Sequence, residues 1–401
     1  MKKLPVAIYA LGATSFLNDV AGEMIYPLLP LFLTTTLGAT AVTLGIIEGS
    51  ADALSSVLKL GSGWLSDRLG RRKPLVVAGY LIASLARPVM AFARAVGLVL
   101  AVRLVDRFGK GLRTSPRDAL IADLAPGGLH GRAFGVHEAM DHAGAVIGPL
   151  LAYALLAAGV GLRSVFLLST VPALAACLVV ALVVREAVRP ASRPEHHARA
   201  AAPALLSRPF IAYLAAVILF GLGNSSDVFL LLRAHDAGLP VEAAPLIWSA
   251  HHVVKSLCSA WGGGLADRIG RRRALALGWL VYAGIYAGFA RAQSGPAIVA
   301  LFVVYGLHFG LVGAAGKALV AEVVPAAARA RGFGAYHLCV GLAALPASVL
   351  FGALYQRFGA GTAFLTGAAL ALCAAAVLPL SRASQRREEP AQIVGAHDGR
   401  Q

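Results

Sequence analysis

Charged side chains that could bind an ionic solute gather in one segment of the sequence, between residues 103 and 123. Its first members are Arg103, Asp106, Arg107, Lys110 and Arg113. Arg103, Arg107 and Lys110 recur at i, i+4 and i+7, so a helix would carry them on one face. Their excess of positive charge favours an anionic or zwitterionic ligand. The segment is therefore either a solvated basic helix or a transmembrane helix whose charges line a polar cavity.

Carboxylates interrupt a second apolar segment, near the start of the chain. At a rise of about 1.5 Å per residue from Val6, Asp19 falls near the middle of a bilayer, and Glu23 follows one turn later. An ionisable group at that depth is costly unless it faces a partner or a cavity, which makes it a functional candidate. We interpret Asp19 or Glu23 as a proton-coupling carboxylate, because a low-dielectric site favours the neutral carboxyl. A structural ion pair is the alternative.

A third group of ionisable residues lies in one apolar segment and comprises His137, Glu138, Asp141 and His142. On a helix the first and third share a face, as do the second and fourth, and the two faces are about 100° apart. Since the four groups cannot surround one ion, no metal site is expected. We expect them to meet the cations of 103–113 across a cavity, with Glu138 as a further proton-coupling candidate. In later apolar segments, Asn224 and His252 are the cavity candidates.

The composition determines the class of protein in which these charges lie. Of 401 residues, 58% are hydrophobic and 14% charged, and the mean hydropathy is +0.72, whereas soluble domains carry about a quarter charged residues. The sequence therefore predicts a polytopic membrane protein. The net charge of +16 lies largely in short links between apolar segments, which argues against a nucleic-acid partner. The four cysteines lie in four different apolar segments, so neither a disulfide nor a zinc site is expected.

Apolar segments of about 20 residues, long enough to span a bilayer, fill almost the whole chain. We predict an all-α polytopic membrane protein with twelve transmembrane helices, near residues 7–36, 42–66, 74–94, 97–123, 132–158, 162–186, 209–233, 240–266, 274–292, 295–322, 332–356 and 361–381. The polar, basic link Arg185–Arg208 separates two halves. The predicted organisation is a six-helix bundle at 1–186, a cytoplasmic linker at 187–208, a second six-helix bundle at 209–382 and a disordered cytoplasmic tail at 383–401.

Lys and Arg residues alternate between links, and this bias sets the orientation in the membrane. One set of links holds Lys2–Lys3, Arg68–Lys73, Arg268–Arg273 and the central linker, while the other holds single residues such as Arg94 and Arg163. The protein is therefore expected in a bacterial-type inner membrane, with both termini in the cytoplasm. The N-terminal stretch MKKLPVAIYALGATSF lacks a small-x-small cleavage site, so it is interpreted as an uncleaved first span.

An internal repeat relates the two halves. GWLSDRLGRRK at Gly63–Lys73 returns as GGLADRIGRRR at Gly263–Arg273, and RDALIADLAP at Arg117–Pro126 returns as GKALVAEVVP at Gly316–Pro325. RAFGVHE at 132–138 likewise matches RGFGAYH at 331–337. Two parallel copies related by an axis along the membrane normal explain these matches. Because the apolar counterpart of the charged segment, at 300–322, is expected to span, the charged segment should span as well.

These motifs resemble those of the major facilitator superfamily. The loop signature G-x-x-x-D-R-x-G-R-[RK] is present at Gly63–Arg72 and again at Gly263–Arg272. Gly144-Ala-Val-Ile-Gly148-Pro149 is similar to the G-x-x-x-G-P part of the family's antiporter motif, and Arg103 matches the arginine expected in its fourth helix. The resemblance covers essentially the whole chain. It implies a secondary transporter that works by alternating access.

The two loop signatures suggest a gate at the cytoplasmic end. Asp67 is expected at the N-terminus of the helix near 332–356, against Arg331 and the amides of Gly332–Gly334, and Asp267 is expected at the N-terminus beside Arg132. Asp123 and Glu322 would pair with Arg71 and Arg271. These contacts would exist only while that end is closed. The gate candidates are Gly63, Asp67, Arg68, Gly70, Arg71, Asp123, Arg132, Asp267, Arg268, Gly270, Arg271, Glu322 and Arg331. A purely topological role for the basic residues is the alternative.

The predicted function is secondary active transport of a small anionic or zwitterionic organic solute, such as an organic acid or a metallophore, coupled to protons. Multidrug/proton antiport that exports amphipathic compounds is the alternative within the class, favoured by the Gly-Pro motif. A membrane sensor or scaffold that binds without transport is the alternative from another class. No G-x-x-x-x-G-K-[ST] signature occurs, which argues against an ATP-driven pump. We expect no enzymatic activity, no cofactor, and a monomer whose partners are the solute, protons and the lipid bilayer.

Overall fold

The computed structural model describes residues 3–29, 32–38, 41–186, 207–225, 227–239 and 244–381, and these residues form helices without any β-strand. The first half contains α1 (Val6–Glu23), η1 (Tyr26–Leu28), η2 (Phe32–Thr36), α3 (Ala41–Leu69), α4 (Lys73–Ala86), η3 (Arg87–Phe92), α5 (Val96–Leu124), α6 (His130–Ala157), α7 (Leu162–Leu168) and α8 (Thr170–Leu182). The second half contains α10 (Arg208–Gly223), α11 (Val228–Asp236), α12 (Ala244–Ile269), α13 (Arg271–Arg291), α14 (Gly295–Val323), η5 (Ala326–Ala328), α15 (Arg329–Val377) and η6 (Leu378–Ser381). The all-α fold predicted from the sequence is confirmed. It satisfies the backbone polar groups within each helix, as a bilayer requires.

Several predicted spans are interrupted helices rather than continuous ones. The span predicted at 7–36 is divided among α1, η1 and the π-helix η2, because Pro27 in η1 has no amide hydrogen to continue the helix. The span at 209–233 is divided between α10 and α11, and the one at 162–186 between α7 and α8. In α15, Gly359 adopts φ 83° and ψ 167°, so this element consists of two helices that meet at a kink.

The length and composition of the helices fit a multi-pass membrane protein. Within the described ranges, six helical stretches are long and apolar enough to cross a membrane: Lys73–Phe92, His130–Ala157, Leu162–Leu182, Arg271–Arg291, Gly295–Val323 and Ala326–Ser381. The last of these contains the kink at Gly359. α10 is apolar but shorter, and α5 carries the charged segment. The total of twelve spans therefore remains a prediction.

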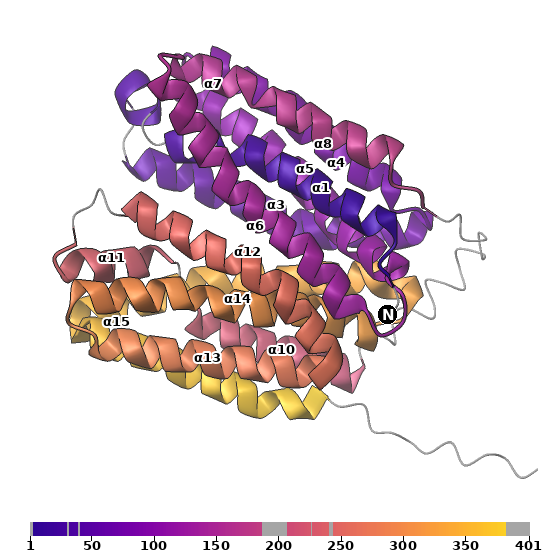
Figure 1. The fold of residues 1–401 in the computed structure, drawn as a ribbon, viewed down its shortest axis with the longest axis vertical. Helices are drawn as coiled ribbons and strands as arrows, with labels where there is room; N and C mark the ends of the chain where they lie inside the picture. Colours follow the sequence, from indigo (N-terminus) through magenta and orange to yellow (C-terminus); the bar gives the residue numbers. More distant parts are fainter. Residues whose placement is uncertain are drawn as a thin grey trace, which may run out of the picture.

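The helices form two groups that correspond to the two sequence repeats. Figure 1 shows α1 to α8 on one side of the molecule and α10 to α15 on the other, close together near the N-terminus and diverging toward α7 and α11. Across the boundary α6 packs against α12 and α14, and α3 packs against α15. Residues 187–206 of the predicted linker (187–208) and the whole predicted tail (383–401) lie outside the described residues. The predicted domain boundaries therefore remain a proposal.

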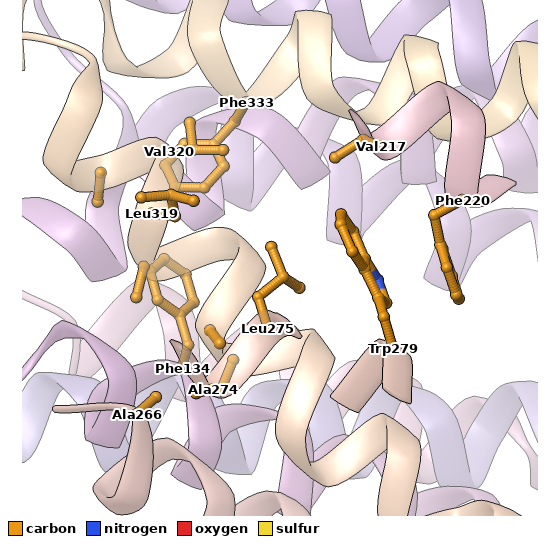
Figure 2. Close-up of a cluster of buried hydrophobic side chains, with 14 of the residues drawn as sticks. Phe134, Val217, Phe220, Ala266, Ala274, Leu275, Trp279, Leu319, Val320 and Phe333 are labelled. Atoms are coloured by element: carbon orange, nitrogen blue, oxygen red, sulfur yellow. The ribbon is translucent and has the colours of Figure 1, made fainter. Parts of the chain in front are cut away.

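Aromatic side chains fill the interior of the second half and reach into the first. Phe220 of α10 stacks on Trp279 of α13 with ring centroids 5.1 Å apart, and Figure 2 shows the two rings facing each other. Phe134 of α6 belongs to the same cluster and lies 5.7 Å from Phe333 of α15. The hydrophobic core thus continues across the boundary between the halves, at the end where the helices converge.

Candidate gate and central charge network

Two loops at one end of the molecule each bring a carboxylate to a helix N-terminus, and we call this end the loop-motif end. Asp67, near the end of α3, accepts hydrogen bonds from the amides of Ala330 (3.2 Å) and Arg331 (2.9 Å) at the start of α15. The first amides of a helix have no intrahelical acceptor and carry partial positive charge, so they stabilise a buried carboxylate. The sequence predicted this helix N-terminus but named the amides of Gly332–Gly334. That detail is wrong, because α15 begins earlier, at Arg329.

The second loop repeats the arrangement with the halves exchanged. Asp267, near the end of α12, accepts hydrogen bonds from the amides of Gly131 (2.8 Å) and Arg132 (2.7 Å) at the start of α6. Arg271 lies 3.6 Å from the same carboxylate. Each half therefore places one carboxylate on a helix of the other half. The sequence repeat relates the two sets of contacts.

Glycines allow the turns and the close approach of helices at the loop-motif end. Gly70 and Gly270 have φ values of 64° and 94°, in the left-handed region that glycine adopts without a Cβ clash. At Gly63 and Gly263, a Cβ atom would overlap a backbone carbonyl of the other half. The two halves therefore meet backbone to backbone at these positions.

Asp123, at the end of α5, joins the two halves through arginines. Its carboxylate lies 2.5 Å from Nε of Arg72 and 2.7 Å from Nη1 of Arg329 in the second half. Arg72 also lies 3.1 Å from Asp67, so it bridges the two carboxylates. The predicted pairing of Asp123 with Arg71 is wrong: the side chain of Arg71 is exposed, while that of Arg72, at the N-cap of α4, is buried.

The equivalent carboxylate in the second half, Glu322, has partners on its own half. It contacts Arg271 at 2.5 Å and Arg272 at 3.1 Å, and the first of these is the predicted partner. Arg68 and Arg268, the remaining arginines of the predicted gate, are exposed. Exposed arginines in these two loops fit a topological role better than a pairing role.

The charged residues of α5 that were predicted to line a cavity, here called the cationic stripe, do not share one face of a cavity. They are Arg103, Asp106, Arg107, Lys110 and Arg113. Asp106 lies 3.1 Å from Arg87 of η3, and the guanidinium of Arg113 lies over the ring of Tyr80 in α4, 4.3 Å from its centroid. Asp106 and Arg113 are both buried inside the first half. The prediction that they line a cavity between the halves is wrong, because Arg87 and Tyr80 hold them against the neighbouring helix within their own half.

The other members of the stripe differ in their access to water. Arg103 lies 3.8 Å from Asp106, and Arg107 lies 3.2 Å from Asp52 of α3. Lys110 is exposed, although carboxylates of α1 and α6 act on its charge from within the first half. Lys110 therefore marks a water-accessible space beside these helices. It is the member of the stripe that best fits the predicted cavity.

Close packing of α1 against α6 brings three carboxylates to this space. They are half-buried and comprise Asp19, Glu23 and Asp141. Ser15 of α1 donates a hydrogen bond to Asp141 of α6. Gly144 and Gly148 of the Gly-Pro motif permit the approach, because a Cβ at either position would overlap backbone atoms of α1. The motif thus positions the carboxylates rather than merely kinking α6.

The remaining predicted cavity residues are found in three different settings. His252 of α12 faces His142 of α6 with ring centroids 6.2 Å apart, so it lies at the boundary between the halves. Asn224 accepts a hydrogen bond from Tyr305 at 3.3 Å. His137 is 1% exposed, and neither ring nitrogen has a hydrogen-bond partner among the described residues. It therefore does not line an open cavity, contrary to the prediction.

A buried charge network crosses the boundary between the halves. Lys317 of α14 lies 3.1 Å from Glu138 of α6 and 3.7 Å from Asp118 of α5. Asp118 is fully buried and also contacts Arg117 at 3.0 Å and His337 of α15 at 2.8 Å. The expectation that Glu138 meets the cations of 103–113 is wrong, since its ion pair in the described chain is with Lys317. Lys317 was outside the predicted set, although an ionisable residue in an apolar span is itself a signal of function.

Repeated loops that each bring a carboxylate to the opposite half agree with a match of the whole chain to one family. The family model described as Major Facilitator Superfamily matches residues 11–254 and 234–397. The chain belongs to the Major Facilitator Superfamily. An uncharacterized MFS-type transporter of Methanocaldococcus jannaschii is 31% identical over 385 residues, which cover 94% of this chain and 95% of that protein. The multidrug resistance protein MdtH of Escherichia coli O1:K1 is 32% identical over 128 residues, 32% of each chain.

Solved structures of this superfamily share the fold of the whole chain. The human organic anion transporter MFSD10 has a TM-score of 0.78 at 17% identity, covering 93% of this chain and 98% of that one. The Escherichia coli fucose:proton symporter FucP has a TM-score of 0.78 at 14% identity, covering 94% of this chain and 99% of that one. At such low identity the likeness shows the fold alone. The chain is thus a multi-pass membrane protein with the fold of the Major Facilitator Superfamily.

Proposed function

We propose that this protein is a secondary active transporter that moves a small anionic or zwitterionic organic solute by alternating access, coupled to protons. The observation that carries the proposal is the pair of contacts in which Asp67 and Asp267 each bind a helix N-terminus of the opposite half. Separation of the halves at the loop-motif end must break both. Such contacts bias an equilibrium between a closed and an open state, as alternating access requires.

The orientation of the gate follows from the distribution of basic residues. The positive-inside bias predicts that the loop-motif end and both termini lie on the cytoplasmic side of an inner membrane. In that orientation the helices converge on the cytoplasmic side and diverge on the outer side, toward α7 and α11 (Figure 1). The half-buried carboxylates Asp19 and Glu23 and the exposed Lys110 would then face a space open to the outside.

Cations from both halves support an anionic or zwitterionic solute. Lys110 of the first half is exposed, and Lys59 of α3 is half-buried. In the second half, Lys255 of α12 is buried, with its Nζ atom 3.7 Å from the centroid of the Phe309 ring. A carboxylate or phosphate of a bound solute would satisfy these cations in place of water. Carboxylates buried or half-buried in the first half, Asp19, Glu23 and Glu138, are the groups that could carry a proton with it.

Multidrug/proton antiport is the second candidate, and one observation favours it. Gly144 and Gly148 belong to a motif that is similar to part of the antiporter motif, and they hold α6 against α1 beside Asp19 and Glu23. The partial similarity to MdtH points the same way. In this mode the same carboxylates would attract a cationic, amphipathic compound.

Purified protein in proteoliposomes tests the proposal. A thermal-shift screen against organic anions, siderophores and cationic drugs first selects a ligand, since a true ligand stabilises the state that it binds. Flux of that ligand is then measured with a pH gradient of either sign and without one. Gradient-dependent flux of an anion supports the proposal, and flux of cationic drugs alone supports antiport. Binding without flux under any gradient would overturn transport and favour a sensor.

A further inference from the structure

The central charge network consists of Asp118, Glu138, Lys317 and His337. The sequence repeat relates its members in pairs, and in each pair an acidic residue corresponds to a basic one. In the two sequence repeats, Asp118 in RDALIADLAP corresponds to Lys317 in GKALVAEVVP. In the same way Glu138, the last residue of RAFGVHE, corresponds to His337, the last residue of RGFGAYH. The repeat therefore maps the contact of Lys317 with Glu138 onto that of Asp118 with His337. Both contacts are present, and both join the two halves.

Opposite charges at equivalent positions make this network different from the rest of the gate. Asp118 and Lys317 face each other across the boundary at 3.7 Å, and their side chains are 0% and 13% exposed. Two like charges at these positions would repel in a low-dielectric site, whereas this pair attracts. The attraction is available only while α5 and α6 lie against α14 and α15. The network therefore belongs to the state that is closed at the loop-motif end.

The members of the network lose different partners when the halves separate. Asp118 keeps a cation on its own helix, because Arg117 contacts it at 3.0 Å. Glu138 keeps no ion pair among the described residues: the cation that contacts it is Lys317, and the nearby Lys255 also belongs to the second half. The first-half groups that act most strongly on Glu138 are Asp118 and Asp141, both anionic. Opening would leave Glu138 beside two carboxylates and without a cation in contact.

Asp19 of α1 does not experience this change. The charged groups that act most strongly on Asp19 are Asp141, Lys110, Glu23 and Arg113, and all of them belong to the first half. Glu23 differs, because Lys255 of the second half also acts on it. The groups around Asp19 move together as the first half moves, so the electrostatic surroundings of Asp19 change less than those of Glu138. A site couples proton binding to a conformational change only if its proton affinity differs between the two states.

We propose that Glu138 is the proton-coupling carboxylate: it is ionised while it pairs with Lys317 in the state closed at the loop-motif end, and it takes up a proton when the halves separate. The proton comes from water on the opened side and forms the O–H bond of the Glu138 carboxyl. On closure the O–H bond breaks and the proton returns to water, since the ammonium of Lys317 again favours the carboxylate. The groups that face Glu138 in this cycle are Asp118 of α5, Asp141 of α6, Lys255 of α12, Lys317 of α14 and Tyr336 of α15. This inference rests on the proposed alternating-access function.

Spin labels on the two halves test the inference without any knowledge of the solute. Gly127→Cys lies between α5 and α6, at an exposed position with open space around it, and Arg273→Cys lies at an exposed position in α13. A background without the four native cysteines makes the labelling specific. Distance measurements on detergent-solubilised full chain, from pH 5 to pH 9, give the ratio of open to closed states at the loop-motif end.

The expected result follows from the linkage of one proton to opening. In the otherwise unmodified chain the ratio of open to closed states should rise on acidification, by up to about tenfold per pH unit where Glu138 titrates. Glu138→Gln should hold the protein in the open state at every pH. Lys317→Gln is a second variant that breaks the same ion pair by removing the cation, and it should also abolish the pH dependence. Asp19→Asn, the matched control, should retain it.

The opposite pattern would overturn the inference. A Glu138→Gln protein that keeps the pH dependence, or an Asp19→Asn protein that loses it, would move the coupling site to α1. A pH-independent distance in the unmodified chain would exclude coupling at Glu138 altogether. Absence of solute flux from proteoliposomes would count against the proposed function but not against pH-dependent opening, so the two failures can be told apart.

Discussion

The two halves share a loop motif and a helical repeat, but they fill their interiors with different side chains. The first half buries ion pairs between its own helices, as between Arg87 and Asp106, and adds a cation over an aromatic ring at Arg113 and Tyr80. The second half buries rings: Phe220 stacks on Trp279, and neighbouring tyrosines and histidines extend the stack. One repeat thus contributes charge and the other contributes apolar packing.

The difference shows how a bilayer protein can hold many charges at low cost. A charge inside a bilayer is expensive unless a partner lies within reach, and pairs such as Arg87–Asp106 and Arg107–Asp52 are formed by neighbouring segments of the first half. The second half buries fewer such pairs among its own helices, because rings bury large areas without charge. Lys317 is a charge of the second half whose partners lie in the first half. The functional boundary is therefore where a charge of one half depends on the other.

The largest effect should come from the carboxylates of the two loops. Asp67→Asn removes the acceptor of two amides and two arginines, at a side chain that is 1% exposed, whereas Asp267 contacts two amides and one more distant arginine. Breaking a buried charged pair costs about 3–5 kcal/mol, so Asp67→Asn should lower initial rates of solute flux by about 100-fold or more. Asp267→Asn should have a smaller effect. Equal rates in both variants, at equal amounts of membrane-inserted protein, would show that the halves contribute alike.

The free energy of unfolding should show how much the ion pairs within the first half stabilise the protein. Arg87→Met leaves Asp106 buried without its closest cation and removes two hydrogen bonds to Asn18. We expect a loss of about 3 kcal/mol in the free energy of unfolding, seen as a lower unfolding temperature in detergent. The double variant Arg87→Met/Asp106→Leu should recover part of this loss, because the carboxylate that Arg87→Met leaves without its closest cation is removed as well. A double variant that is less stable than the single one would contradict this account of the first half.

Backbone contact between the halves can be tested with a pair of neighbouring glycines in α12. A Cβ at Gly263 would overlap the carbonyl oxygen of Gly131, whereas a Cβ at Gly264 meets only open space. Gly263→Ala should destabilise the closed state by about 1–3 kcal/mol and raise the open fraction at the loop-motif end by about tenfold. Gly264→Ala should leave the distance distribution between labels on the two halves unchanged. An equal shift in both variants would mean that helix propensity, rather than contact, sets the balance.

The smallest effect should separate the two adjacent arginines of the first loop. Arg72 uses its planar fork to reach Asp67 and Asp123 together, and lysine cannot reproduce two such directed contacts. Arg72→Lys should reduce flux by several-fold, since each charge-assisted hydrogen bond is worth about 1.5–3 kcal/mol. Arg71→Lys, at an exposed position, should remain within about twofold of the parent, as surface charge pairs contribute about 0–1 kcal/mol. A stronger effect at Arg71 would restore the pairing predicted from the sequence.

The gate was predictable because it depends on features that sequence displays directly. A repeated motif places Asp67 and Asp267 at equivalent loops, and helix starts are the natural sites for such carboxylates. The choice between Arg71 and Arg72 was not predictable, since it depends on which of two adjacent side chains the turn at Gly70 directs inward. The distinction needs backbone geometry, and a pattern of residue types does not contain it.

The interior was predicted less well than the gate, for a reason seen in α5. Spacing places Arg103, Arg107 and Lys110 on one face, but neighbouring helices decide what each side chain contacts. Arg107 contacts Asp52 of α3, whereas Lys110 is exposed. Lys317 was overlooked because its segment is apolar enough to span without question. Alignment of the two repeats, with Asp118 opposite Lys317, was the signal that could have identified it.

The contact of Gly63 and Gly263 with carbonyl groups of the opposite half has a consequence for leakage. These contacts leave no room for a methyl group, and hence none for a file of water molecules between the helices. In the proposed transport cycle, a contact without water between these helices would keep protons from crossing while that end is closed. Side chains at the same positions would hold the helices apart and let water thread between them. Because glycine has no side chain, the helices meet backbone to backbone at these positions, without a gap that water could enter.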